Sequence, residues 1–218
     1  MVAMPNLSRR LFTAGLAASA AVPLASCMEA IVPAPPPEIE PLDYAARRDG
    51  DHVIPAVPIE DVPEWLRRQV VAFDTDEEPG TIVIELDDAL LHLVMPDRYA
   101  LRYGLGVGRR GLGWRGEAEI YRTAHWPRWT PTENMIRRDP DLERWEDGQP
   151  GGPDNPLGAR ALYLRTISSG QDEGIRIHGT PEWRSIGDRA SSGCFRMINH
   201  DVIDLYGRVE RGTRVVVR

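Results

Sequence analysis

The sequence predicts a mainly β domain, mixed between a sandwich and a barrel-like form, with one or two short helices and a long inserted loop. Short runs of alternating apolar and polar residues follow Gly80. Turn residues, such as Pro96 and Asp97, separate these runs. The length of 218 residues suits one domain with extensions better than two full domains. The predicted strands are 81–86, 89–95, 100–108, 117–123, 161–166, 174–179 and 213–218.

Two helical segments interrupt the strand pattern. One is predicted near 132–147, and the other over 200–210, where Val202 and Leu205 belong to an apolar stripe. Asn199 is the predicted N-cap of the second helix, because its side chain can accept a hydrogen bond from the first turn.

The insertion from 125 to 156 is long for a loop in a compact β domain, and such segments are often lids or binding loops. It contains Trp126, Trp129 and Trp145. These rings are equally consistent with stacking on a sugar or peptide and with closing a small core inside the insertion.

The composition excludes several classes of function. The chain has 26 basic residues, all of them arginine, and 33 acidic residues, so its net charge is −7. This charge lacks the basic excess that is typical of nucleic-acid-binding proteins. Because the chain has no lysine, Schiff-base and P-loop lysines are also excluded. Two cysteines are too few for a disulfide scaffold or a four-cysteine zinc site. The glycine run 104–108 lies inside a strand pattern, which argues against dinucleotide binding.

Residues 1–27 predict an export signal. Arg9 and Arg10 precede sixteen uncharged residues, 11–26, which is short for a membrane span of about 20. The segment from Ser8 to Phe12 resembles the twin-arginine motif, which exports folded proteins. An ordinary secretory signal that happens to carry two arginines is the alternative.

Cys27 ends a segment, Leu24 to Cys27, that resembles a bacterial lipobox. In a lipobox the cysteine is acylated, and the acyl chains hold the protein at a bilayer. The alternative is cleavage near the alanines, with Cys27 discarded or incidental. The leader therefore predicts a periplasmic protein whose only membrane attachment is a lipid on Cys27.

The segment 28–79 predicts a proline-rich acidic spacer between this signal and the domain at 80–218. It holds nine prolines, and four arginines face thirteen acids. Such a composition buries too little apolar surface to order fully, and its proline-rich first part favours an extended tether. Only 63–73 has helical apolar spacing, which predicts a short helix packed on the domain.

His178 and Cys194 are candidates for a nucleophilic pair. A thiol near its ordinary pKa of about 8.5 needs a neighbouring base at neutral pH. Gly193 allows a tight turn in which its backbone N–H and that of Cys194 face a developing oxyanion. Arg196 offers a fixed positive charge for a substrate carboxylate. The alternative is that Cys194 is a buried structural thiol beside Phe195.

Other polar residues are weaker candidates. Arg176 and Trp183 are possible substrate contacts, although a solvent-facing strand residue is the simpler account of Arg176. His52, His92 and His125 lack the spacing of metal ligands, so no metal site is expected.

The segments HGT, 178–180, and SSGCFRM, 191–197, resemble the signature of the L,D-transpeptidase catalytic domain of the YkuD type. The similarity extends over roughly 79–218. It implies that Cys194 is the nucleophile, that His178 accepts and later donates its proton, and that the backbone of Gly193 and Cys194 forms the oxyanion hole. It also implies substrate-binding positions at Arg196, Gly179 and Ser192. One residue departs from the signature, because Ser192 stands where the family usually has a histidine.

The resemblance implies peptidoglycan chemistry without a metal or organic cofactor. Cys194 would attack the carbonyl of the third stem-peptide residue, expel D-Ala and form a thioester. The acceptor would be another stem, giving a 3→3 cross-link, or a protein amine, or water. Because of Ser192, a catalytically silent wall-binding lipoprotein is the rival hypothesis, and a metal-dependent peptidase is a third.

Overall fold

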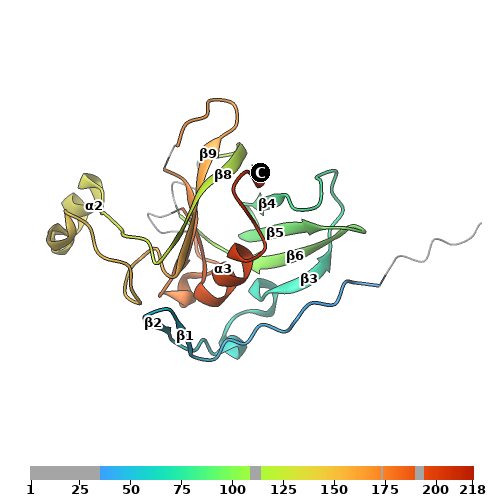
Figure 1. Ribbon diagram of the computed structural model, residues 1–218, viewed down its shortest axis with the longest axis horizontal. Coiled ribbons are helices and arrows are strands. Elements are labelled where there is room, and N and C mark those ends of the chain that lie inside the picture. Colours follow the sequence, from blue (N-terminus) through green and yellow to red (C-terminus); the bar gives the residue numbers. More distant parts are fainter. Residues whose placement is uncertain (1–34, 109–113, 173, 190–193) are drawn as a thin grey trace, which may run out of the picture. The chain divides into compact units, whose positions relative to one another are not determined.

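The computed structural model describes residues 35–108, 114–172, 174–189 and 194–218 (Figure 1). It confirms the mainly β fold. Over the described residues, ten strands form one sheet in the order β3-β6-β5-β4-β12-β8-β9-β10-β11-β7, and β1 and β2 form a separate hairpin. The strands are β1 (Arg47–Asp49), β2 (His52–Ile54), β3 (Gln69–Ala72), β4 (Ile82–Glu85), β5 (Leu90–Met95), β6 (Tyr99–Gly104), β7 (Gly106–Val107), β8 (Gly116–His125), β9 (Arg160–Thr166), β10 (Arg176–Thr180), β11 (Phe195–Ile198) and β12 (Arg214–Val217).

The large sheet closes on itself in a barrel-like way. Only Leu105 separates β6 from β7, yet these strands are second and last in the strand order. The two ends of the sheet must therefore approach each other. The core lies inside this curl, where Leu91 and Tyr103 from one half pack in the same buried cluster as Leu162 and Ile177 from the other.

The sheet segment from β8 to β11 has two different faces. Leu162, Ile177 and Phe195 point to the core face, where helix α3 (Asn199–Tyr206) also packs. Side chains alternate along a strand, so Tyr163 and His178 point to the opposite face. This second face carries the candidate site.

Asn199 is not the N-cap of α3, contrary to the prediction. Ile198 occupies that position and Asn199 is the first helical residue. Its side-chain Oδ1 instead accepts a hydrogen bond from the backbone N–H of Ala159 at 2.9 Å. Asn199 is buried, so its side chain serves the connection to β9 rather than its own helix.

The helix predicted over 63–73 is wrong. A 3₁₀ turn, η2 (Glu64–Leu66), buries Leu66, and the chain then continues as β3 against β6. Val70 and Val71 are β-branched and fit a half-buried strand better than a helix. A second 3₁₀ turn, η1 (Ile59–Asp61), precedes them.

Part of the predicted spacer is ordered by contacts with the domain, although its composition predicted incomplete order. The described residues from 35 onward belong to one compact unit. Asp49 of the β1–β2 hairpin binds the buried Arg160 through two hydrogen bonds of 2.7 and 2.8 Å. The buried Arg68 donates to Asp204 of α3 at 2.8 Å. These long-range ion pairs, which composition does not reveal, order an acidic segment.

The insertion contains the helical segment expected near 132–147, divided into α2 (Glu133–Arg138) and the 3₁₀ helix η3 (Pro140–Trp145). The side chain of Thr132 caps α2 by accepting from the backbone N–H of Met135. At the base of the insertion, the buried amide of Asn155 donates to the carbonyls of Pro127 and Pro150. Figure 1 shows α2 projecting away from β8 and β9.

The described residues contain no helix that is long and apolar enough to cross a membrane. The predicted export signal and lipobox, with Cys27, lie outside the described residues.

Candidate active site

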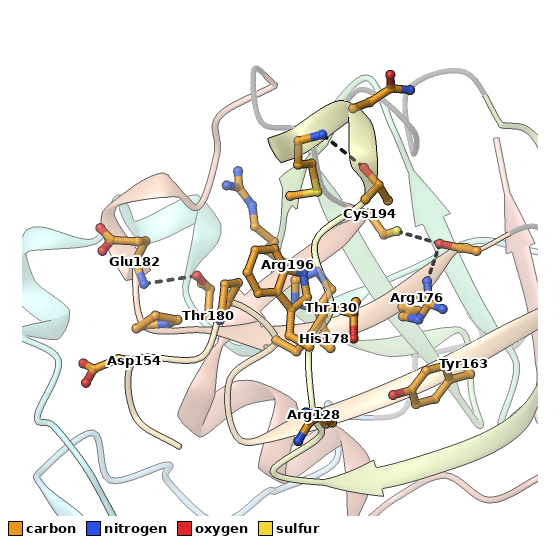
Figure 2. A pocket seen from close by; sticks show the side chains of 18 of the residues that line it. Arg128, Thr130, Asp154, Tyr163, Arg176, His178, Thr180, Glu182, Cys194 and Arg196 are labelled. Atoms are coloured by element: carbon orange, nitrogen blue, oxygen red, sulfur yellow. Dashed lines mark hydrogen bonds between the residues drawn. The ribbon is translucent and has the colours of Figure 1, made fainter. Parts of the chain in front are cut away.

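A cavity of about 820 Å³ lies over the face of β8–β11 that points away from the core, which we call the outer face. Residues of the insertion also line it (Figure 2). It is strongly cationic, because five arginines and only two acids line it. The ionic residues of its lining are Arg122, Arg128, Arg138, Arg176, Arg196, Asp154 and Glu182. His178 and Cys194 line the same cavity.

The pairing of β10 with β11 brings the two candidate catalytic residues together. These strands are parallel, with His178 opposite Arg196 and Ile177 opposite Phe195. Cys194 precedes Phe195 by one residue and therefore lies beside Arg176. Because Arg176 and His178 are two positions apart, the thiol and the imidazole belong to one face of the sheet. Cys194, sixteen positions after His178, is thus on the segment that leads into the adjacent strand.

The side chain of His178 is held in one tautomer. Its Nδ1 lies 2.7 Å from the carbonyl oxygen of Gly179. A carbonyl can only accept, so Nδ1 carries the proton and Nε2 of the neutral ring is left as a proton acceptor. The structure therefore places an oriented base in the cavity.

Burial lowers the pKa of His178 to about 4, and the charges of Arg196 and Arg176 act in the same direction. The Gly179 carbonyl opposes them by stabilising the imidazolium. The net effect is a ring that is neutral at pH 7, as a general base must be.

The thiol of Cys194 is buried, and its Sγ donates to the carbonyl oxygen of Gly174 at 3.2 Å. The same oxygen accepts from Nη1 of Arg176 at 2.7 Å, as the two dashed lines in Figure 2 show. Arg176, which the sequence offered only as a weaker candidate, thus shares a hydrogen-bond acceptor with the sulfur of Cys194.

Arg196 points into the cavity beside His178. Its Nη2 donates to the carbonyl of Ser185 at 3.2 Å. Its buried Nε has no hydrogen-bond partner among the described residues. The guanidinium packs against Gly106, where a Cβ would come within 2.7 Å of Nη2. A cation with an unused donor is suited to an anionic ligand.

Two of the predicted substrate contacts do not line the cavity. Gly179 faces α3, since a Cβ at this position would lie 2.2 Å from Oδ1 of Asn199. Trp183, in the 3₁₀ turn η4 (Trp183–Ser185), lies in a separate groove and packs beside Ile186. Gly179 faces α3 because side-chain directions alternate along β10. Trp183 lies outside the cavity because its ring packs on an apolar cluster. The predicted roles of Ser192 and of Gly193 in the oxyanion hole fall outside the described residues.

The three tryptophans of the insertion lie in three different surroundings. Trp129 lines the cavity. Trp126 instead donates from its indole Nε1 to Asp49 at 2.8 Å and packs against His52. Trp145 is not part of the cavity lining and lies beside Arg144.

Sequence reasoning missed Arg122 and Tyr163, which line the cavity beside Arg176. No local motif marks them. A β-bulge between Ile120 and Arg122 determines which way Arg122 points, and strand alternation alone gives the opposite face.

Metal binding is not indicated by the side chains. Within the described ranges, no three His, Cys, Asp or Glu side chains converge on a point that could hold a metal ion.

Comparison with known proteins identifies relatives of this domain. A family model described as the L,D-transpeptidase catalytic domain, YkuD, matches residues 79–217. The "Putative L,D-transpeptidase in ATP synthase subunits region ORF 5" of Fuscovulum blasticum is 42% identical over 103 residues, 47% of this chain and 49% of the relative. The "Probable L,D-transpeptidase ErfK/SrfK" of Escherichia coli strain K12 is 33% identical over 145 residues, 62% of this chain and 43% of the relative. The chain spans about half the length of these curated relatives.

One solved structure is similar over most of its length. A Brucella melitensis protein, described as a probable carnitine operon oxidoreductase, is 49% identical and covers 74% of this chain and 99% of that chain, with a TM-score of 0.50. In the present chain, Gly104 and Gly106 are strand residues of β6 and β7 and do not form the strand-to-helix turn of a dinucleotide site. The family match, which covers more than half of the sequence, shows that the chain belongs to the L,D-transpeptidase catalytic domain family.

Proposed function

We propose that this protein is an exported, cysteine-dependent L,D-transpeptidase that acts on peptidoglycan tetrapeptide stems. One observation carries the proposal. Cys194 and the oriented base His178 line one cationic cavity from two adjacent parallel strands. Membership of the family supports the same assignment.

The first half-reaction acylates the enzyme. The thiol proton of Cys194 moves to Nε2 of His178 as sulfur attacks the carbonyl carbon of the third stem residue. The oxygen becomes an oxyanion, for which the backbone N–H groups of Gly193 and Cys194 are the proposed donors. When the carbonyl reforms, the C–N bond breaks, His178 returns its proton to the leaving amine and D-Ala departs. A thioester on Cys194 remains.

The second half-reaction transfers the acyl group to an amine. The acceptor amine loses a proton to His178 and attacks the thioester carbon. The C–S bond then breaks, and His178 returns that proton to the sulfur, which regenerates the thiol. An amine of another stem gives a 3→3 cross-link, and an amine of a wall-attached protein gives protein anchoring. With water as acceptor the same steps make the protein an L,D-carboxypeptidase.

Covalent labelling tests the proposal. Intact mass spectrometry after incubation with a carbapenem is expected to show one adduct on the wild type and none on Cys194→Ala. If the wild type stays unmodified while stem peptides still bind, the rival hypothesis of a catalytically silent wall-binding lipoprotein replaces the enzyme. Peptide cleavage that a chelator abolishes would favour a metal-dependent peptidase.

The acceptor is identified by product analysis. Purified protein is incubated with isolated peptidoglycan, which is then digested, and the muropeptides are separated and weighed. We expect 3→3 dimers and released D-Ala. Tripeptides without dimers would assign the carboxypeptidase activity, and absence of both products would contradict acyl transfer from this substrate.

We also propose that the leader places the protein in the periplasm with a lipid on Cys27. Arg9, Arg10 and the segment from Leu24 to Cys27 support this proposal. Mass analysis of the mature N-terminus tests this directly. In the wild type, an acylated Cys27 is expected. In Cys27→Ser, we expect no acylation and a soluble protein. A mature chain that begins before or beyond Cys27 would contradict lipidation.

A further inference from the structure

Four side chains lie in a row across the outer face of the sheet. Arg122 of β8 is the partner of Tyr163 in β9, and Tyr163 is the partner of Arg176 in β10. Cys194, one residue before the partner of Ile177, continues this row into the neighbouring segment. The row therefore runs from an exposed arginine to the sulfur.

A β-bulge creates this arrangement. Ile120 pairs with Leu164, but the next pair is Arg122 with Tyr163, so Tyr121 is the extra residue. Without the bulge, Tyr121 would be opposite Tyr163 and Arg122 would point to the other face, because side chains alternate. Bulges re-aim side chains beside active sites in this way.

The ring of Tyr163 holds both guanidinium groups. The Cζ of Arg122 lies 4.4 Å from the ring centroid, and that of Arg176 lies 4.9 Å away. Both distances suit cation–π contacts, which orient a guanidinium without neutralising it. Tyr163 is itself nearly buried, so the ring is a fixed support.

Neither guanidinium is neutralised by an acid in the described part of the chain, where no ion pair involves Arg122 or Arg176. Asp172, an acid in the same region, accepts a hydrogen bond from Tyr121. In contrast, Arg165, two residues beyond Tyr163 in β9, is paired with Glu119. Two adjacent cations that share a ring and lack an acid are suited to one carboxylate.

The position of His178 decides which part of the substrate carries that carboxylate. In the proposed reaction His178 protonates the leaving amine, so D-Ala departs on its side of the sulfur. Arg176 lies two residues from His178 along β10, which separates their Cα atoms by about 6.6 Å at 3.3 Å per residue. Through the shared Gly174 carbonyl it lies beside the sulfur instead. The arginines therefore face the acyl fragment that stays on the enzyme.

We propose that Arg122 and Arg176, supported by Tyr163, form a carboxylate subsite for the acyl-donating part of the peptide. This proposal rests on the proposed function and adds a preference for donors with free, non-amidated carboxylates. The carboxylate belongs either to the second residue of the stem or to the side chain of the third, and the substrate arms below distinguish these two sources.

The test measures binding separately from chemistry. In a Cys194→Ala background, isothermal titration calorimetry compares a free-acid tetrapeptide with two peptides amidated singly, at the second or at the third residue. Hydrogen bonds to charged groups contribute enough that Arg122→Gln with Arg176→Gln should weaken binding of the free-acid peptide about 10- to 100-fold. The same double substitution should have little effect on the peptide amidated at the recognised position.

Matched variants show whether the effect belongs to the subsite. Arg165→Gln removes an arginine from the same face of β9 outside the cavity and should leave binding unchanged. Tyr163→Phe keeps the ring and should bind like the parent, whereas Tyr163→Leu should weaken binding of the free-acid peptide. Thermal unfolding confirms that each variant is folded.

The outcomes separate the two proposals. Equal losses for free and amidated peptides, or no loss in the double variant, would overturn the carboxylate subsite even if the wild type forms an acyl-enzyme. If the wild type forms no acyl-enzyme but the free-acid peptide binds selectively through Arg122 and Arg176, the subsite stands and the transpeptidase activity fails.

Discussion

His178 of β10 and Arg196 of β11 are direct partners across two parallel strands. A permanent cation beside the imidazole disfavours a second positive charge, and burial acts more strongly in the same direction. The ring is therefore neutral, and its Nδ1 donates to Gly179. Burial thus keeps the ring in the neutral form that the proposed general base requires, and the pairing with Arg196 adds to this effect.

Replacing His178 by Ala should slow acylation by a carbapenem about 10²- to 10⁴-fold, the usual cost of removing a general base. Stopped-flow measurement of acylation provides the rate, and intact mass confirms the adduct. His125→Ala is the matched control, because His125 is exposed and does not line the cavity. A His178→Ala rate close to that of the wild type would contradict the assignment of the base.

The pH dependence of acylation should reflect the lowered pKa of His178. The neutral ring is the active form, so activity is retained as pH falls through 6.5 and is lost near pH 4, where the ring becomes protonated. Arg196→Gln removes one of the lesser causes of the shift and should move this acidic limb upward in pH. Arg165→Gln should leave the limb in place. A wild-type limb at the ordinary histidine pKa of about 6.5 would show that the ring is not desolvated as described.

The strands of the domain could be predicted because their signals are local. Period-two alternation and turn residues located β4, β5 and β9, whose predicted bounds differ from the observed ones by no more than one residue. The predicted run 100–108 is divided in the structure between β6 and β7 at Leu105. The sequence also pointed to His178 and Cys194, but β11, which aligns the two, has no alternating pattern of its own.

The remaining features depend on partners far along the chain. Val70 and Val71 form a strand because β6 offers an open edge, which apolar spacing does not show. Arg122 enters the cavity because β8 has one extra residue before it. Simple alternation, which ignores this residue, places Arg122 on the opposite face of the sheet. Asp49 is held by hydrogen bonds from Arg160, 111 positions away, and from Trp126. Composition alone predicted a segment that does not order fully here.

Asp49→Ala should destabilise the domain by about 3 to 5 kcal/mol, since removing one partner leaves the buried Arg160 uncompensated and deprives Trp126 of an acceptor. Urea unfolding followed by circular dichroism measures the loss. The matched control is Asp74→Ala, because Asp74 pairs with Arg98 and both side chains are more than 70% exposed. We expect that control to change stability by about 0 to 1 kcal/mol. Equal effects of the two substitutions would mean that the hairpin does not anchor the domain.

Gly179→Ala should destabilise the junction between β10 and α3. A Cβ would lie 2.2 Å from Oδ1 of Asn199, and this oxygen cannot easily move, since it accepts from Ala159 at 2.9 Å. Overpacking of this kind costs about 1 to 3 kcal/mol, measured here by urea unfolding. Gly207→Ala is the matched control. Its Cβ would find only ordinary contacts of 3.6 and 3.8 Å, at a φ of −72° that alanine adopts freely.

A double substitution shows whether this contact is the cause. Asn199→Ala alone should lose stability, because the backbone N–H of Ala159 is left without its acceptor, at a cost of about 1 to 3 kcal/mol. Combined with Gly179→Ala, it also removes the clashing oxygen, so the double variant should be less destabilised than the sum of the two single variants. Strict additivity would show that Gly179 is required for a reason other than its approach to Asn199.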